Sequence, residues 1–158
     1  MNAAPLRLRM TAHALLLDTS GQVLLTRTAT GVWALPSTPL AFQVSPYEQV
    51  VALARDVLGI EVAERDLLLA HVCAHRSSTG HGGLGLVISV GHWHGQPVPP
   101  PAPAGGQPSR RWCSPGHPPQ PLATWDAAVL PALLVNRVYT EIGWNLHPAP
   151  NNPTGTSR

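Results

Sequence analysis

The segment from Ser45 to Gly59 carries both the start and the stop signals of a helix, and it constrains the fold more than any other part of the chain. Ser45 is a favourable N-cap, Pro46 suits the first helical position, and Glu48 can complete a capping box. Gly59 favours the left-handed turn that ends a helix. Most positions between these signals are apolar, so we expect the helix to be buried or to form an apolar contact.

Strands are expected on both sides of this helix. Alternating apolar residues and turn signals predict strands at residues 8–18, 22–28, 66–75, 84–94 and 110–113. A second helix is expected to start after Thr124 and to run towards Tyr139, with Pro131 kinking or restarting it. We therefore expect one domain over residues 1–147 that contains a proline-rich loop at 96–121, followed by a flexible tail at 148–158.

Charge, apolar runs and cysteines limit the partners and the location that we expect for this chain. The net charge is only +2 and no basic run is longer than Arg110-Arg111, so neither a nucleic-acid surface nor a nucleic-acid partner is expected. The apolar stretches are too short for a signal peptide or a membrane span. We therefore expect a cytoplasmic location, where Cys73 and Cys113, which lie far apart in the chain, would be free thiols.

The stretch GVWALPST and the helix after it resemble the Nudix box of the small bacterial Nudix hydrolases, Gly-x5-Glu-x7-Arg-Glu-U-x-Glu-Glu-x-Gly-U, in which U is aliphatic. Gly59 and Ile60 align with the last two positions of the box, and the spacing is retained. The chemistry is not retained, because the conserved Gly, Glu, Arg-Glu and Glu-Glu positions are occupied here by Thr38, Val44, Ala52, Leu53, Asp56 and Val57.

The resemblance extends from about Arg9 to Trp144. It includes VLLTRTATGVWALP before the box and LLLAHVCAHR, GLGLVISVGHWHGQPV, RRWCSP and EIGW after it. It implies an α/β fold class, with a mixed β-sheet sandwiched between helices in an α/β/α sandwich. It also implies substrates in which a nucleoside diphosphate is linked to another group, and it makes His71 and His75 residues of the pocket.

The substitutions in the box predict loss of the usual hydrolase activity. Magnesium and manganese need oxygen ligands, and Leu53 and Val57 supply none. Asp56 alone would hold a metal only loosely, and Glu48 is better explained by capping than as a displaced ligand. We therefore expect no cofactor, and Mg²⁺ or Mn²⁺ only if the box metal site has been rebuilt elsewhere.

Other side chains suggest alternatives. His71, Cys73 and His75 alternate along one predicted strand and His92 and His94 along the next, so they could form a zinc site; the simpler interpretation is a set of pocket residues with a small buried cysteine. Trp33 could stack on a nucleobase, whereas Arg27 could bind phosphate or could be a solvated surface arginine.

Three hypotheses remain open. In the first, the chain is a pseudoenzyme that binds a nucleotide-like ligand, another small molecule or a protein partner, and a deep pocket lined by Arg27 and Trp33 would favour it. In the second, it is an active hydrolase of nucleoside diphosphate derivatives, with metal ligands relocated to Asp56, Glu48, His92 and His94. In the third, it is a homodimerisation module, favoured by an exposed apolar patch on residues 47–58.

Overall fold

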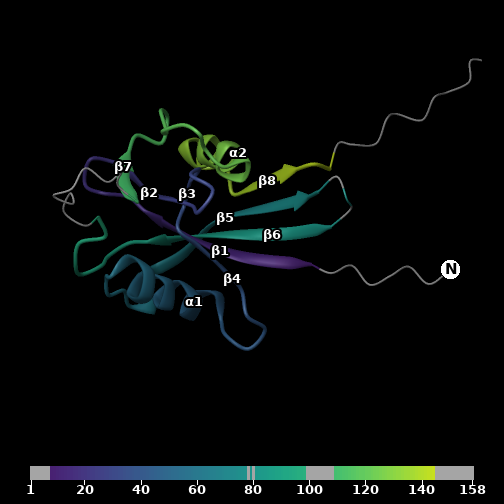
Figure 1. The fold of residues 1–158 in the computed structure, drawn as a ribbon. Helices are drawn as coiled ribbons and strands as arrows, with labels where there is room; N and C mark the ends of the chain where they lie inside the picture. The colour runs from purple at the N-terminus through teal and green to yellow at the C-terminus, as the bar shows by residue number, and fades with distance from the viewer. Residues whose placement is uncertain (1–7, 78, 80, 99–108, 145–158) are drawn as a thin grey trace, which may run out of the picture.

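A five-stranded mixed sheet with the strand order β4-β1-β6-β5-β8 lies at the centre of the computed structural model, which describes residues 8–98 and 109–144 apart from 78 and 80 (Figure 1). Strand β1 pairs in parallel with β6, β5 pairs in parallel with β8, and the other pairs are antiparallel. The strands span Arg9–Leu16 (β1), Ser37–Pro39 (β4), Leu67–Arg76 (β5), Gly82–Val90 (β6) and Tyr139–Ile142 (β8).

A smaller sheet with the order β3-β2-β7 adjoins it, and helices cover both faces of the large sheet (Figure 1). The small sheet consists of Val23–Arg27 (β2), Trp33–Ala34 (β3) and Arg110–Cys113 (β7). The helices are α1 (Pro46–Leu53), the π-helical turn η1 (Ala54–Leu58), the 3₁₀ turn η2 (Glu64–Asp66) and α2 (Thr124–Leu134). The prediction of a mixed sheet sandwiched between helices is confirmed. None of the helices in the described part of the chain is long and apolar enough to cross a membrane.

Helix α1 begins as its sequence predicts. The Ser45 Oγ accepts a hydrogen bond from the Glu48 N–H, and the Glu48 carboxylate accepts one from the Ser45 N–H, each at 3.1 Å. The helix ends at Gly59, which has a positive φ of 69°. Its inner face is buried in a core cluster that also contains side chains of β1 and β6, among them Val50, Leu53, Ala54, Leu58, Ala12, Ala14 and Ile88.

A second core cluster lies under α2. It contains Leu15, Val87 and Cys73 of the large sheet together with Leu25, Leu35 and Leu130. The buried Asp126 of α2 lies beside this cluster and accepts a hydrogen bond from the Leu35 N–H at 2.7 Å. This bond ties α2 to the segment that leads into the box. Burial raises the pKa of the Asp126 carboxyl to about 6, although the Leu35 amide acts in the opposite direction.

Two predicted element boundaries were wrong, and one strand was not predicted. Strand β6 ends at Val90 and not at residue 94, so His92 and His94 lie beyond it and do not share its alternation. Helix α2 ends at Leu134 and not near Tyr139, and Asn136 follows with a φ of 54°, which no helix can adopt. Residues 139–142 form strand β8, which the sequence analysis did not predict. Helix α2 runs on through Pro131, so of the two predicted alternatives, a kink or a restart, the restart is wrong.

The raised pKa of Asp126 predicts a pH-dependent difference in stability between the native protein and the Asp126→Asn variant. The folded protein holds this proton more tightly than the unfolded chain, whose carboxyl has the ordinary pKa of 3.8. The stabilisation that the protonated Asp126 carboxyl contributes to the folded state is therefore full below pH 3.8 and is lost as the pH rises through about 6. Urea unfolding should show the stability of the native protein, relative to that of Asp126→Asn, falling by about 2 kcal/mol between pH 4 and pH 7. A difference that does not change with pH would contradict this.

Candidate functional site

The outer face of the box helix offers few carboxylates that could bind a metal ion. Leu53 is buried, and Val57, half exposed, offers no ligand atom. Asp56 forms an exposed ion pair with its neighbour Arg55, with 2.7 Å between Arg55 Nε and Asp56 Oδ1, and this pairing lowers the pKa of Asp56. The remaining box positions are equally unsuited to a metal ion: Thr38 pairs with Ala12 across β4 and β1, Val44 is exposed, and Ala52 is half-buried.

Glu48 does not replace the missing ligands. Its carboxylate accepts the Ser45 N–H in the capping box. Glu48 and Asp56 are also eight residues apart, which corresponds to a rise of about 12 Å along a helix. That separation prevents both carboxylates from binding one ion at metal–oxygen distances near 2 Å. The residues of this helix therefore do not fit the divalent metal that the Nudix box holds.

Arg110 of β7 holds the C-terminal end of the box helix, a role that the sequence analysis missed. Its Nη1 donates to the carbonyls of Leu58 at 3.2 Å and Pro97 at 3.0 Å, and its Nη2 donates to the carbonyl of Val57. The last carbonyls of a helix have no partner within the helix, so a cation at this end is favourable. A basic residue on a distant strand gives no local sequence signal of such a role.

Arg27 and Trp33 lie together, and Arg111 joins them to form a cationic pair, Arg27 and Arg111, over one ring. The guanidinium carbons of Arg27 and Arg111 lie 6.0 and 5.6 Å from the centre of the Trp33 ring. Arg27 also donates from Nε to the Gly31 carbonyl at 3.2 Å. Trp33 is only 6% exposed, so its ring supports the two cations and presents little surface for stacking on a base. The pair concentrates positive charge beside the segment that leads into the box.

The predicted histidine strand is β5, and His71 is fully engaged there. Its Nδ1 donates to the carbonyl of Arg137 at 2.7 Å, and its Nε2 accepts from the Thr140 hydroxyl at 2.9 Å. Cys73 is buried, and burial raises the pKa of its thiol. In the described part of the chain no three His, Cys, Asp or Glu side chains are grouped so that they could hold a metal ion. The geometry therefore gives no support to a zinc site.

The sequence analysis also missed a stack of two aromatic rings, His13 of β1 and Trp125 of α2. The rings of His13 and Trp125 lie parallel, with centroids 3.7 Å apart and 9° between their planes. Trp125 fits because its neighbour on β6 is Gly85, and His75 fits over Gly83 in the same way. The alternate glycines of β6 were a sequence signal that bulky side chains cross the strand.

Three nitrogens in or near this stack are buried without a hydrogen-bond partner: His13 Nδ1, Trp125 Nε1 and His75 Nδ1. Burial, with a smaller effect of the nearby His75, lowers the pKa of His13 to about 4. His13 is therefore neutral at pH 7, and the stack adds no positive charge from His13 to this face of the sheet.

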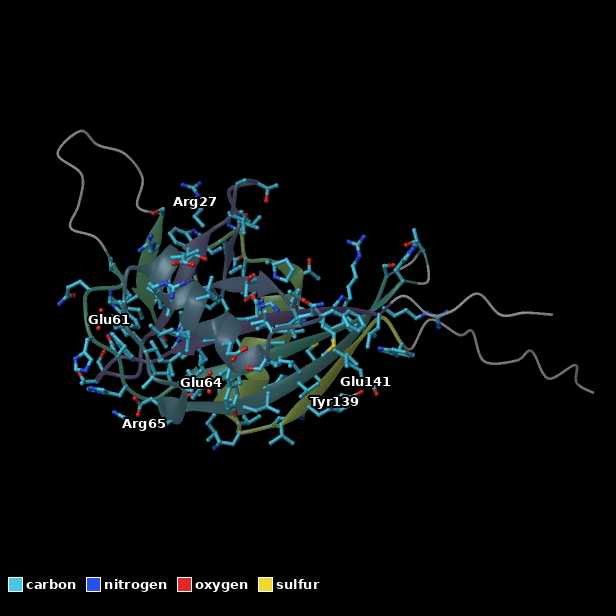
Figure 2. All side chains as sticks on the ribbon, turned by 90° about the horizontal axis from the view of Figure 1, so that it is seen from below. Arg27, Glu61, Glu64, Arg65, Tyr139 and Glu141 are labelled. Atoms are coloured by element: carbon cyan, nitrogen blue, oxygen red, sulfur yellow. The ribbon has the colours of Figure 1, made fainter. Side chains whose placement is uncertain are left out.

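His92 and His94 contact each other at the edge of a small polar cavity. Their ring centroids are 4.9 Å apart in an edge-to-face arrangement. The cavity has a volume of about 240 Å³, and its polar lining also includes Glu61, Arg65 and Asp66. In Figure 2, Arg27 lies at the opposite edge of the molecule from Arg65, so the cationic pair and this cavity are separate regions.

Solved structures with a similar arrangement of strands and helices include a Nudix hydrolase and MutT proteins. The chain is similar to the ORF135 protein of E. coli, with a TM-score of 0.67 and 22% identity over 87% of this chain and 96% of that one. It is similar to a MutT Nudix hydrolase from Burkholderia pseudomallei, with a TM-score of 0.61 and 21% identity over 79% and 97%. A MutT protein from Bacillus halodurans gives a TM-score of 0.63 and 17% identity over 85% and 88%.

The chain therefore has the Nudix fold, as its sequence pattern indicates. No family model matches the sequence, and no curated protein matches it either. At these identities the likeness concerns the fold, and the chemistry has to be argued from the side chains that this chain places on it.

Replacing Arg110 by Met should weaken the end of the box helix. The substitution keeps the aliphatic part of the side chain but removes the donors to three carbonyls. We expect the free energy of unfolding in urea to fall by about 2–3 kcal/mol, because charge-assisted hydrogen bonds are lost from a partly buried site. Arg65→Met, an exposed change in η2, should alter stability by less than about 0.5 kcal/mol. Equal effects of the two changes would show that the contacts of Arg110 add no stability.

Replacing Gly85 by Ala should disturb the aromatic stack. The added Cβ would overlap the indole of Trp125, so the indole or the strand must move. We expect a loss of about 1–3 kcal/mol in urea unfolding, which is typical of overpacking. Gly116→Ala is the matched control, because the nearest atom to its new Cβ, Ser114 Oγ, is 3.9 Å away. A neutral Gly85→Ala would contradict close packing of Trp125 on β6.

Proposed function

We propose that this Nudix-fold chain does not hydrolyse substrates through its box helix and that it binds a phosphate-bearing, nucleotide-like ligand at Arg27 and Arg111. The observation that carries the first part is the state of the box helix. Leu53 is buried and Val57 has no ligand atom, while Asp56 is paired with Arg55 and Glu48 caps the helix. Without metal ions to stabilise charge on a diphosphate, the activation free energy of hydrolysis is expected to rise by several kcal/mol. A rise of about 2.7 kcal/mol already lowers the rate a hundredfold.

The ligand class follows from the cationic pair. Two guanidinium groups lie over one aromatic ring, on neighbouring strands β2 and β7 whose register pairs Leu25 with Arg111. Guanidinium groups bind phosphate oxygens in a bidentate manner, so two of them suit a diphosphate better than a single charge. One neighbour in fold is an ADP-ribose pyrophosphatase from Streptococcus suis, with a TM-score of 0.53, which makes ADP-ribose a reasonable probe.

An active hydrolase with relocated metal ligands is the second candidate. Its ligands would have to come from the polar cavity lined by Glu61, Asp66, His92 and His94, because carboxylates and imidazoles bind divalent metals. No three of the described His, Cys, Asp or Glu side chains are grouped to hold one ion, so this candidate ranks second. The cavity lies apart from Arg27, so such an enzyme would need to place its phosphate groups elsewhere.

Calorimetric titration with Mg²⁺ and Mn²⁺, followed by a phosphate-release screen over nucleoside diphosphate derivatives, separates the two candidates. We expect no micromolar metal binding and no turnover. Micromolar binding with turnover would contradict the proposal. In that case Glu61→Gln and Asp66→Asn should abolish turnover, whereas Glu64→Gln, which changes an acid outside the cavity lining, should leave it unchanged.

Binding of the ligand is tested with ADP and ADP-ribose as probes. We expect Arg27→Gln and Arg111→Gln each to weaken binding about tenfold or more, because each removes a charge-assisted contact worth about 1.5–3 kcal/mol. Arg65→Gln removes the same charge from the distant edge and should leave the affinity unchanged. Binding that responds equally to all three variants would indicate nonspecific attraction and would contradict the assigned site.

A further inference from the structure

Among the described residues, strand β8 forms an edge of the large sheet and has β5 as its strand neighbour. The N–H of Val72 donates to the carbonyl of Val138 at 2.9 Å, and Val72 is the register partner of Tyr139. In a parallel pair with this pattern, the backbone groups of Val138 and Thr140 face β5. Backbone groups alternate along a strand, so the N–H and C=O of Tyr139 and Glu141 point away from the sheet.

Exposed apolar side chains surround this edge. Val138 is 71% exposed, Val135 and Leu68 are each 68% exposed, and Leu134 is 52% exposed. Leu68, Leu134 and Val138 also line a cavity of about 540 Å³ whose other walls are mostly aliphatic. An unpaired edge strand beside a contiguous apolar surface is the usual mark of a site of association.

The charges and backbone hydrogen-bonding groups of β8 favour pairing with a second copy of this chain in one particular register. A second copy can pair with this edge about a two-fold axis, with the strands antiparallel, and the outward-facing residues then allow three registers. Centring the axis on Tyr139 would require the backbone of Arg137, whose N–H already donates to Ala132 and whose carbonyl already accepts from His71. Centring it on Glu141 would place two like charges opposite each other, which is unfavourable.

Centring the axis on Thr140 gives hydrogen-bond partners to the outward-facing backbone groups of Tyr139 and Glu141. Tyr139 of each copy then exchanges two backbone hydrogen bonds with Glu141 of the other, which gives about four bonds in total. The Tyr139 hydroxyl, which donates to the Glu141 carboxylate of its own chain at 2.9 Å, lies beside the Glu141 of the other copy as well. Figure 2 shows Tyr139 and Glu141 together at the rim of the molecule.

The same register matches the apolar residues. Val138 lies opposite Ile142 of the second copy, so an exposed apolar side chain is covered by another apolar side chain. Continued beyond the strand, the register brings Trp144 of the second copy to the level of Asn136. Trp144 is 43% exposed, and Val135, next to Asn136, is among the exposed side chains at this edge.

We propose that the β8 edge and the apolar side chains around it bind a second copy of this chain, joining two five-stranded sheets into one continuous sheet about a two-fold axis at Thr140. The interface is isologous, because each copy contributes the same residues. It does not use the box helix, whose apolar residues Val50, Leu53, Ala54 and Leu58 are buried within the chain. The dimer and the proposed ligand site are independent, because Arg27 lies at the opposite edge from Tyr139 (Figure 2).

Sedimentation velocity on the full chain over a range of concentrations is the first measurement. The expected species has twice the mass of the 16.8 kDa chain. Val138→Asp should weaken dimerisation at least tenfold, because it places a charge opposite Ile142 of the other copy. Phe42→Asp is the matched control, since Phe42 is fully exposed on the segment between β4 and α1 and should leave the dimer intact.

A cross-linking experiment tests the register. In the proposed arrangement the two Thr140 residues form a non-hydrogen-bonded antiparallel pair, with Cα atoms about 4.5 Å apart, which a disulfide can bridge. Oxidised Thr140→Cys should give a covalent dimer, whereas the native chain, with Cys73 and Cys113 buried, and Thr30→Cys, on an exposed turn, should not.

Several outcomes would overturn the proposal. A monomer at all concentrations would do so, as would a dimer that Val138→Asp and Phe42→Asp weaken equally. Failure of Thr140→Cys to cross-link a dimer would place the interface elsewhere. If the full chain were monomeric and a chain shortened after Trp144 dimerised, the occupant of the edge would be residues 145–158 and not a second copy.

Discussion

The packing of the box helix against the large sheet is the contact on which the rest of the structure depends. Val50, Leu53, Ala54 and Leu58 are buried in one cluster with side chains of β1 and β6. Burial of several aliphatic side chains contributes on the order of 1.5–3 kcal/mol each. The capping box at Ser45 fixes where the helix begins, and Arg110 fixes its end to β7. The helix is therefore anchored at both ends by side chains of the chain itself.

Two of the buried polar side chains, Asp126 and His71, join segments that are distant in the sequence. Asp126 connects α2 to Leu35, and His71 connects β5 to the chain that enters β8. Asp126 and His13 shift towards their neutral forms: burial raises the pKa of Asp126 to about 6 and lowers that of His13 to about 4. Among the accessible charged groups, two arginines share the ring of Trp33.

Fold and chemistry are separable in this chain. The backbone follows that of Nudix hydrolases from several bacteria over most of its length, yet the helix that carries catalytic carboxylates in the Nudix box is occupied by aliphatic and paired side chains. A fold depends on burial and spacing, whereas metal catalysis depends on a few oxygen atoms at fixed distances. Of the box positions without a carboxylate, Leu53 is buried in the core and Val57 is half exposed, so the helix still packs on the sheet.

The sequence by itself determined the box helix with its caps, the main strands of the sandwich and the loss of the box carboxylates, because local capping chemistry and apolar alternation are written in neighbouring residues. Only the tertiary structure revealed strand β8, the hold of Arg110 on the helix end and the stacking of Trp125 on His13. It also separated His92 and His94 from β6. These features join residues that are distant in the chain, and their energies come from contacts that exist only after the sheet has formed.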